Sequence, residues 1–184
     1  MKQLITGPKS EPVSVQELKD QLRIEHDDEN EYLARLISTA REYAENLSGN
    51  KILEQQWSIH YEAFTSPLML FMRPVKSIES VQYYDADNVL QTLDSSVYEV
   101  TPYNFHSAIH LNNGQSWPAV YTRQYPVIVN ATFGRSLPLK TEQHAILLIA
   151  TNWYRNREDA TKEQLKTIPH GAESLLSQHL NVGF

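Results

Sequence analysis

The chain has 184 residues, of which 41% are hydrophobic and 21% charged, the composition of an ordinary globular domain. Its formal net charge of −6 argues against a protein that grips nucleic acid by neutralising phosphates, though not against one past which DNA moves. The absence of cysteine excludes disulfides, thiolate metal sites and cysteine nucleophiles.

The first residues, to Pro8, carry no apolar run long enough for a signal peptide. No later segment approaches the length of a membrane span either. We therefore expect a soluble protein made in the cytoplasm. No helix or strand is predicted before Ser14.

Two helices are predicted in the first 50 residues. Ser14-Val15-Gln16-Glu17 is a capping-box pattern, and Val15, Leu18 and Leu22 give the short helix after it one apolar side. A second start is predicted at Asp27-Asp28, whose carboxylates suit the positive end of a helix. Apolar residues then recur every three or four positions up to a stop at Ser48-Gly49-Asn50, which predicts an amphipathic helix of about five turns.

The pattern changes to strand spacing between about residues 55 and 134, where apolar and polar residues alternate. The predicted strands are 57–61, 68–72, 78–83, 89–93, 97–101 and 127–133. Asp85-Ala86-Asp87-Asn88 is a strong turn signal, and the segment from Asn112 to Pro118 is expected to be an ordered loop. This region predicts a small antiparallel sheet or sandwich.

Helical patterning returns after Pro138, which suits a first helical turn. The run from Ala145 to Ala150 is apolar nearly all round, so this helix is expected to lie centrally and to be covered on several sides. Arg155 to Gln164 is charged and is expected to be an exposed turn or loop, before a last short amphipathic segment that follows Ile168. The fold class is therefore α+β: one domain over residues 1–184, with a helical body from 11–52 and 136–184 and a β-rich insertion at about 55–134.

His106 and His110 are the nearest approach to a metal-binding pair. On a helix their spacing would place both rings on one face, but Ile109 and Leu111 indicate a strand, on which the two residues would lie roughly 13 Å apart. A metal site needs three or more converging ligands. We interpret the two histidines as surface or sheet-face residues.

Acidic residues offer two further candidates, and each has a simpler explanation. A cluster before the second helix could bind a divalent cation, but it lacks the spacing of a calcium loop and is explained by helix capping. This cluster consists of Glu25, Asp27, Asp28, Glu29 and Glu31. Asp85 and Asp87 could be paired carboxylates for glycoside chemistry, but turn formation explains both.

Trp57, Trp117, Trp153 and the ten tyrosines could form a stacking platform for sugars or bases. Basic residues do not alternate with them as a nucleic-acid platform requires, so a role in the core or in an interface is favoured. The sequence has no nucleophile elbow, phosphate-binding glycine loop or dinucleotide fingerprint. We therefore expect no catalytic residue, cofactor or metal, and no enzymatic activity.

Read in chain order, several motifs resemble one family. The N-terminal half combines Ser14 to Ile24, Asp27-Asp28, and Leu33 to Gly49 with its core Ala40-Arg41-Glu42-Tyr43. Later come Gly114 to Pro118, then Ala145 to Ala150 followed by Asn152 to Glu158, and finally Pro169 to Leu176. This order resembles the head–tail connector (adaptor) proteins of tailed double-stranded DNA bacteriophages, in the subgroup with a β-rich insertion. The resemblance runs from about Glu11 to Leu180 and departs from the family over the charged stretch from Arg157 to Lys166.

The resemblance implies a structural role in the neck of a phage or prophage virion. Subunits would bind the portal protein and form a homo-oligomeric ring that matches its expected twelvefold symmetry. The ring would extend the channel, through which DNA passes without sequence-specific binding, and would dock the next neck or tail-completion protein. No membrane is involved.

Two sets of residues are candidates for these contacts. A C-terminal apolar face would bind the portal or another partner, although it could also pack back on its own subunit. The polar face of the second helix would form a ring or channel surface, with a plain solvated face as the alternative. The first set is Leu175, Leu176, Leu180 and Phe184, and the second is Arg35, Arg41, Glu42 and Glu45.

Two other functions remain open at this point. One is a β-rich binding module that recognises carbohydrate or protein through the aromatic residues of the insertion. The other is a small hydrolase that uses Asp85, Asp87 or the histidines, although no convergent polar constellation supports it.

Overall fold

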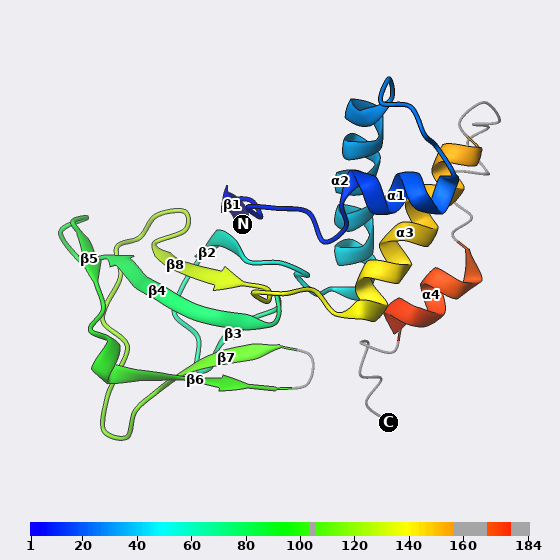
Figure 1. Ribbon diagram of the computed structural model, residues 1–184. Coiled ribbons are helices and arrows are strands. Elements are labelled where there is room, and N and C mark those ends of the chain that lie inside the picture. The colour runs from blue at the N-terminus through cyan, green and yellow to red at the C-terminus, as the bar shows by residue number, and fades with distance from the viewer. Residues whose placement is uncertain (104–105, 157–168, 178–184) are drawn as a thin grey trace. The chain divides into compact units, whose positions relative to one another are not determined.

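The computed structural model describes residues 1–103, 106–156 and 169–177 (Figure 1). The chain divides into two compact units, which are described separately. The sheet unit comprises Met1–Pro8 and Glu54–Arg135, and the helical unit comprises Lys9–Leu53 and Ser136–Phe184. Helices and antiparallel sheets are both present, so the predicted α+β class is confirmed.

The helical unit contains α1 (Val15–Leu22), α2 (Asn30–Ser48), α3 (Lys140–Arg155) and α4 (His170–Ser177). The predicted capping box begins α1: the Glu17 amide donates to Ser14 Oγ at 3.1 Å, and the Ser14 amide donates to Glu17 Oε2 at 2.7 Å. The predicted stop of α2 is also present, since Gly49 adopts a left-handed φ of 68° just after the helix.

The predicted starts of α2 and α3 need correction. α2 begins at Asn30 rather than at Asp27-Asp28, because the Asp27 carboxylate instead accepts hydrogen bonds from Lys19 Nζ at 2.6 Å and from Asn30 Nδ2 at 3.1 Å. α3 begins at Lys140, after Pro138, so this proline precedes the first turn instead of lying in it.

α3 lies against each of the other three helices, as its nearly uniform apolarity predicts. Its fully buried residues include Ile146 and Ile149, and they pack with Leu33 and Ile37 of α2 and with Leu18 of α1. Burial of a Leu or Ile side chain contributes roughly 1.5–3 kcal/mol each, so this shared core holds the four helices together.

The sheet unit contains two antiparallel sheets among the described residues. The larger sheet has the order β1-β2-β8-β4-β5, and the smaller has the order β3-β7-β6. The strands are β1 (Lys2–Thr6), β2 (Gln55–Tyr61), β3 (Leu68–Leu70), β4 (Val75–Tyr84), β5 (Leu90–Thr92), β6 (Tyr98–Pro102), β7 (Ser107–Leu111) and β8 (Val127–Phe133), with a 3-10 turn, η1 (Ser95–Val97), before β6. The sequence did not predict β1, and it indicated β7 only through the strand-like surroundings of His110.

The two sheets share one apolar core, so they form a small sandwich. Alternate residues of β8, among them Val127, Val129 and Phe133, face this core together with Leu68 and Ile109. On the other face of the larger sheet, polar side chains bond to one another across the strands. There Asn130 Nδ2 donates to Ser80 Oγ at 3.0 Å and to Gln82 Oε1 at 3.2 Å.

Candidate functional site: assembly surfaces

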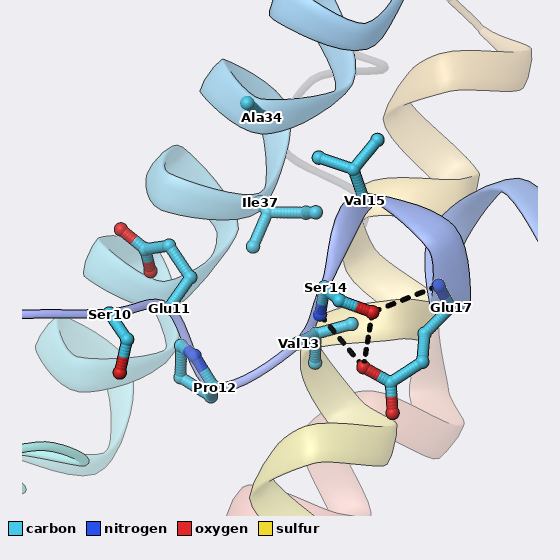
Figure 2. Close-up of a pocket in the computed structure, with 9 residues that line it drawn as sticks. All are labelled: Ser10, Glu11, Pro12, Val13, Ser14, Val15, Glu17, Ala34 and Ile37. Atoms are coloured by element: carbon cyan, nitrogen blue, oxygen red, sulfur yellow. Dashed lines mark hydrogen bonds between the residues drawn. The ribbon is translucent and has the colours of Figure 1, made fainter. Parts of the chain in front are cut away.

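An open groove of about 440 Å³ lies in the helical unit, between the segment that precedes α1 and the side of α2 (Figure 2). Its lining is largely apolar, and Figure 2 shows Ile37 reaching from α2 toward the segment from Val13 to Val15. The carboxylates of Glu11 and Glu17 are among the few polar groups of the lining.

Both carboxylates of the groove already have partners within the unit. Glu17 accepts hydrogen bonds from the Ser14 amide and hydroxyl, and these bonds lower its pKa below the ordinary value. Glu17 therefore remains ionised at neutral pH and is not suited to donate a proton. The groove suits contact with an apolar side chain better than it suits acid–base chemistry.

Arg41 and Glu45 of α2 are buried, so the structure corrects their expected place on an exposed polar face. Arg41 Nε donates to Glu11 Oε2 at 2.8 Å, and Arg41 Nη1 lies 3.5 Å from Glu45 Oε2. Lys51 Nζ lies 3.1 Å from the same Glu45 oxygen, and the Ile52 amide donates to Glu45 Oε1 at 3.1 Å. These residues, called the Arg41 network below, join the chain before α1 and the chain after α2 to the middle of α2.

Arg41 remains charged in this buried position. Burial acts to lower its pKa, but the hydrogen bond that Arg41 donates to Glu11 and the charges of Glu11, Glu45 and Glu42 outweigh that effect and raise the pKa. The network thus holds the chain before α1 and the chain after α2 to the middle of α2 through internal ion pairs.

Arg35 and Glu42 do lie on the exposed side of α2. The Arg35 side chain is 72% exposed, and its guanidinium is 4.0 Å from Glu31 one turn earlier. Glu42 is also exposed, and one of its oxygens is 3.6 Å from Arg41. For these two residues the predicted ring or channel surface stays a prediction.

The C-terminal apolar set is divided between core and undescribed residues. Leu176 is 1% exposed and belongs to the core of the helical unit, and Leu175 is half-buried against the same core. At these two positions the apolar face packs on its own unit. Leu180 and Phe184 lie outside the described residues.

The two histidines lie near one another around Tyr103. The Tyr103 ring stacks on His106 with a centroid distance of 4.8 Å, and its hydroxyl is 3.1 Å from His110 Nε2. Exposed Phe71 lies beside His106, with ring centroids 6.4 Å apart. In the described part of the chain, no group of three histidine or acidic side chains is placed to hold a metal ion.

Several of the acidic candidates accept hydrogen bonds from the backbone or from other side chains. Asp85 Oδ1 accepts from the amides of Asp87 and Val89 at 3.0 Å each, and Asp85 Oδ2 accepts from Gln91 Nε2 at 2.7 Å. The bonds from Val89 and Gln91 lower the Asp85 pKa, so Asp85 is a turn residue held in its ionised form. In the acidic cluster, Glu29 accepts from the hydroxyl of Tyr154.

The tryptophans pack internally rather than forming a platform. Trp117 stacks on Phe64 with centroids 4.5 Å apart, against the sandwich core that Trp57 also contacts. Trp153 packs edge-on against Tyr43 at 5.6 Å in the helical unit.

The two edges of the larger sheet are exposed and partly apolar. All five residues of β1 are exposed, including Leu4 and Ile5, and so are all three residues of β5. Among the described strands, none pairs with the outer side of either β1 or β5. Exposed strand edges are templates for pairing with another chain.

Sequence reasoning missed both the groove and the β1 edge. A signal for the groove was available, because Val13 immediately precedes the Ser14 cap and Leu18 follows it by four residues. This is the spacing of a hydrophobic staple, and both residues are buried. β1 offered no alternating pattern, since its two neighbouring apolar residues Leu4 and Ile5 are both exposed.

Residues 12–109 match the model of the phage gp6-like head–tail connector protein family, which is more than half of the chain. The chain belongs to this head–tail connector family. The matched segment includes α1, α2, every residue of the Arg41 network except Glu11, and most strands of the sheet unit.

Solved structures share the fold of this connector over its full length. A chain in the virion of a native gene transfer agent particle aligns with a TM-score of 0.78 at 19% identity, covering 100% of this connector and 97% of that chain. A chain in the neck of the native particle, computed with C12 symmetry, gives the same values. A chain in the neck of the empty particle, computed with C6 symmetry, gives a TM-score of 0.77 at 19% identity with the same coverage.

No curated protein matches this connector. No described helix of the connector has both the length and the apolarity needed to cross a membrane.

Proposed function

We propose that this connector is a structural protein of the virion neck, which binds the portal and forms a ring there. The ring extends the DNA channel and offers a surface to the next neck or tail-completion protein. Membership of the head–tail connector family carries this proposal. The shared fold with chains of gene transfer agent particles, two of them in neck structures, supports it.

A ring of identical copies requires a heterologous contact, in which one surface of each copy meets a different surface of the next. The neck structure computed with C12 symmetry supports a ring of twelve. A rigid subunit favours this assembly because little conformational freedom is lost when the ring closes. The buried Arg41 network and the shared helical core supply such rigidity within the helical unit.

The acidic charge suits a channel past which DNA moves. A net charge of −6 per chain amounts to about −72 for twelve copies, and such a field repels phosphates rather than holding them. The same charge disfavours a role that depends on tight DNA binding.

The structure offers no alternative chemistry in the part that it describes. The Asp85 carboxylate is bonded into the turn that also contains Asp87, and the three tryptophans considered for sugar binding pack against the two cores. A non-enzymatic role is therefore proposed.

Co-sedimentation with the purified portal of the same virion tests the proposal. We expect the full chain to sediment with portal at a fixed ratio and to stay in solution without it. A double substitution of Leu180→Ser and Phe184→Ser tests the predicted partner-binding set and is expected to reduce the bound fraction at least tenfold, a loss of about 1.4 kcal/mol. Failure of the full chain to sediment with portal would refute the proposal.

A further inference from the structure

We propose that neighbouring copies in the ring join their larger sheets edge to edge, with β5 of one copy pairing in parallel with β1 of the next. This inference rests on the ring proposed above and names the contact that closes it.

The backbone of β1 offers hydrogen-bonding groups outward. The Met1 and His60 backbones exchange hydrogen bonds of 2.8 and 2.9 Å, so the residues that follow alternate between facing β2 and facing away. Lys2 and Leu4 oppose Ile59 and Trp57 in positions where the peptide groups of β1 face away from β2.

The backbone of β5 does the same at the opposite edge of the sheet. The Leu93 amide bonds to the Val81 carbonyl at 2.7 Å, and the Asp85 amide bonds to the Val89 carbonyl at 3.0 Å. Between these two pairs the alternation turns the peptide groups of Leu90 and Thr92 outward. Each edge therefore presents outward the backbone N–H and C=O groups of two residues that lie two positions apart. These residues are Lys2 and Leu4 on β1, and Leu90 and Thr92 on β5.

Strand polarity matches the two edges in the way that a ring requires. Each neighbouring pair in the order β1-β2-β8-β4-β5 is antiparallel, so β1 and β5 run in the same direction. A rotation that carries one copy to the next keeps this direction and brings β5 alongside the next β1 as a parallel pair. Opposite edges of one sheet are also the two different surfaces that a heterologous contact needs.

The charges at the two edges favour pairing of β1 with β5 over pairing of β1 with a second β1. Residues 1–8 carry Lys2 and no acidic side chain, whereas residues 85–94 carry three aspartates, which outnumber the one basic side chain bonded to this turn among the described residues, that of Arg123 at Asn88 Oδ1. Parallel pairing brings the N-terminal ends of β1 and β5 together, and with Gln3 opposite Leu90 it places Lys2 opposite Val89, directly after the turn that contains exposed Asp87. Pairing of two β1 edges would instead bring two lysine-bearing strands together.

The dimensions are compatible with a ring. Sixty strands, five from each of twelve copies, would span about 290 Å at about 4.8 Å per strand, which corresponds to a radius of roughly 46 Å. Such a ring keeps an open centre.

Engineered cysteines test the contact directly, because the natural chain has none. Gln3 opposes Ser58, and Leu90 opposes Tyr84, so register places the side chains of Gln3, Leu90 and Thr92 on the same, outer face of the sheet. Leu4 opposes Trp57 and therefore lies on the other face. The test variants are Gln3→Cys with Leu90→Cys, and Gln3→Cys with Thr92→Cys, which sample two registers. Leu4→Cys with Leu90→Cys is the matched opposite-face control.

Each variant is first assembled on portal under reducing conditions and imaged for rings, then oxidised and separated without reductant. We expect rings in all variants. At least one same-face variant is expected to give a ladder of disulfide-linked chains, at about tenfold the yield of the opposite-face control. In that control the two Cβ atoms lie too far apart to form a disulfide. Single variants are expected to stay unlinked.

Rings without a ladder in either same-face variant would overturn the edge-to-edge contact while leaving the proposed function intact. Efficient linking by Gln3→Cys alone would overturn it in favour of a two-fold contact between β1 edges. An absence of rings on portal in the natural chain would remove the proposed function and this contact with it.

Discussion

Arg41 shows how the structure uses a charge that sequence periodicity assigns to solvent. Its side chain is 6% exposed and that of Glu45 is 2% exposed. Their partners Glu11 and Lys51 come from the chain on either side of the two N-terminal helices. Desolvation makes such a pair a modest net stabiliser, but removing Arg41 leaves the buried Glu45 carboxylate with Lys51 and without its second counter-charge.

We therefore expect Arg41→Met to lower the free energy of unfolding by about 3 kcal/mol, because Glu45 and Glu11 lose their shared partner. Arg35→Met is the matched control on the same helix, where the side chain is largely exposed, and a change below about 0.5 kcal/mol is expected. Denaturant unfolding followed by helical circular dichroism measures both. Equal effects of the two substitutions would show that the Arg41 network carries no special stability.

Glu17 makes the stability of the helical unit depend on pH. Its pKa is lowered in the folded chain, chiefly by the hydrogen bond from the Ser14 amide, so the unfolded chain binds the proton more readily. The stabilisation that this shift provides is present at pH values above the pKa of Glu17 in the unfolded chain, near 4.5. It is lost as the pH falls through the lower pKa of Glu17 in the folded chain.

Glu17→Gln is expected to lower stability at pH 7 and to have progressively less effect below about pH 4, since protonation then neutralises the natural residue as well. Urea unfolding of both chains between pH 2.5 and 7 measures the difference. A difference that stays constant across this range would contradict the assigned role of the charged form.

At the scale of elements, two glycines near helix ends have opposite requirements. Gly49 adopts a φ of 68° after α2, a conformation that costs an alanine roughly 1–2 kcal/mol. Gly171 lies inside α4 without a positive φ, and an added Cβ would meet Leu148 Cδ1 at an ordinary 3.6 Å.

Gly49→Ala is therefore expected to destabilise the chain by about 1 kcal/mol, whereas Gly171→Ala is expected to stabilise it by about 0.5 kcal/mol through the unfolded state and helix propensity. Thermal unfolding of the two variants beside the natural chain measures the shifts. Destabilisation by Gly171→Ala would mean that α4 packs more closely on α3 than described.

The helices and the central strands could be predicted because their signals are local. The capping box at Ser14, the glycine stop at Gly49 and the alternation from Val127 to Phe133 each act within a few residues. β1 could not be predicted, since it is an exposed edge that buries no face, and its pairing partner β2 lies about 50 residues away.

The candidate site was less predictable than the fold for a related reason. Helical periodicity placed Arg41 and Glu45 with Arg35 on a polar side, but it carries no information on the ion partners that bury them. Leu176 was correctly recognised as apolar, yet only the packing of α4 shows that it faces its own core. The neighbouring positions of His106, His110 and Tyr103 depend likewise on the β6–β7 hairpin.

At the scale of the whole molecule, each of the two units of this connector presents a surface suited to contact with another chain. The helical unit presents an apolar groove whose carboxylates are internally paired, and the sheet unit presents two open edges of matching polarity. Both features use surfaces rather than reactive groups. The central claim is that identical copies of this chain close a ring on the portal.

Cryo-electron microscopy of the chain bound to portal, with no symmetry imposed, tests that claim most directly. The account predicts a closed ring of twelve copies stacked coaxially on the portal. Portal particles that carry no ring, or only isolated copies at excess chain concentration, would contradict it.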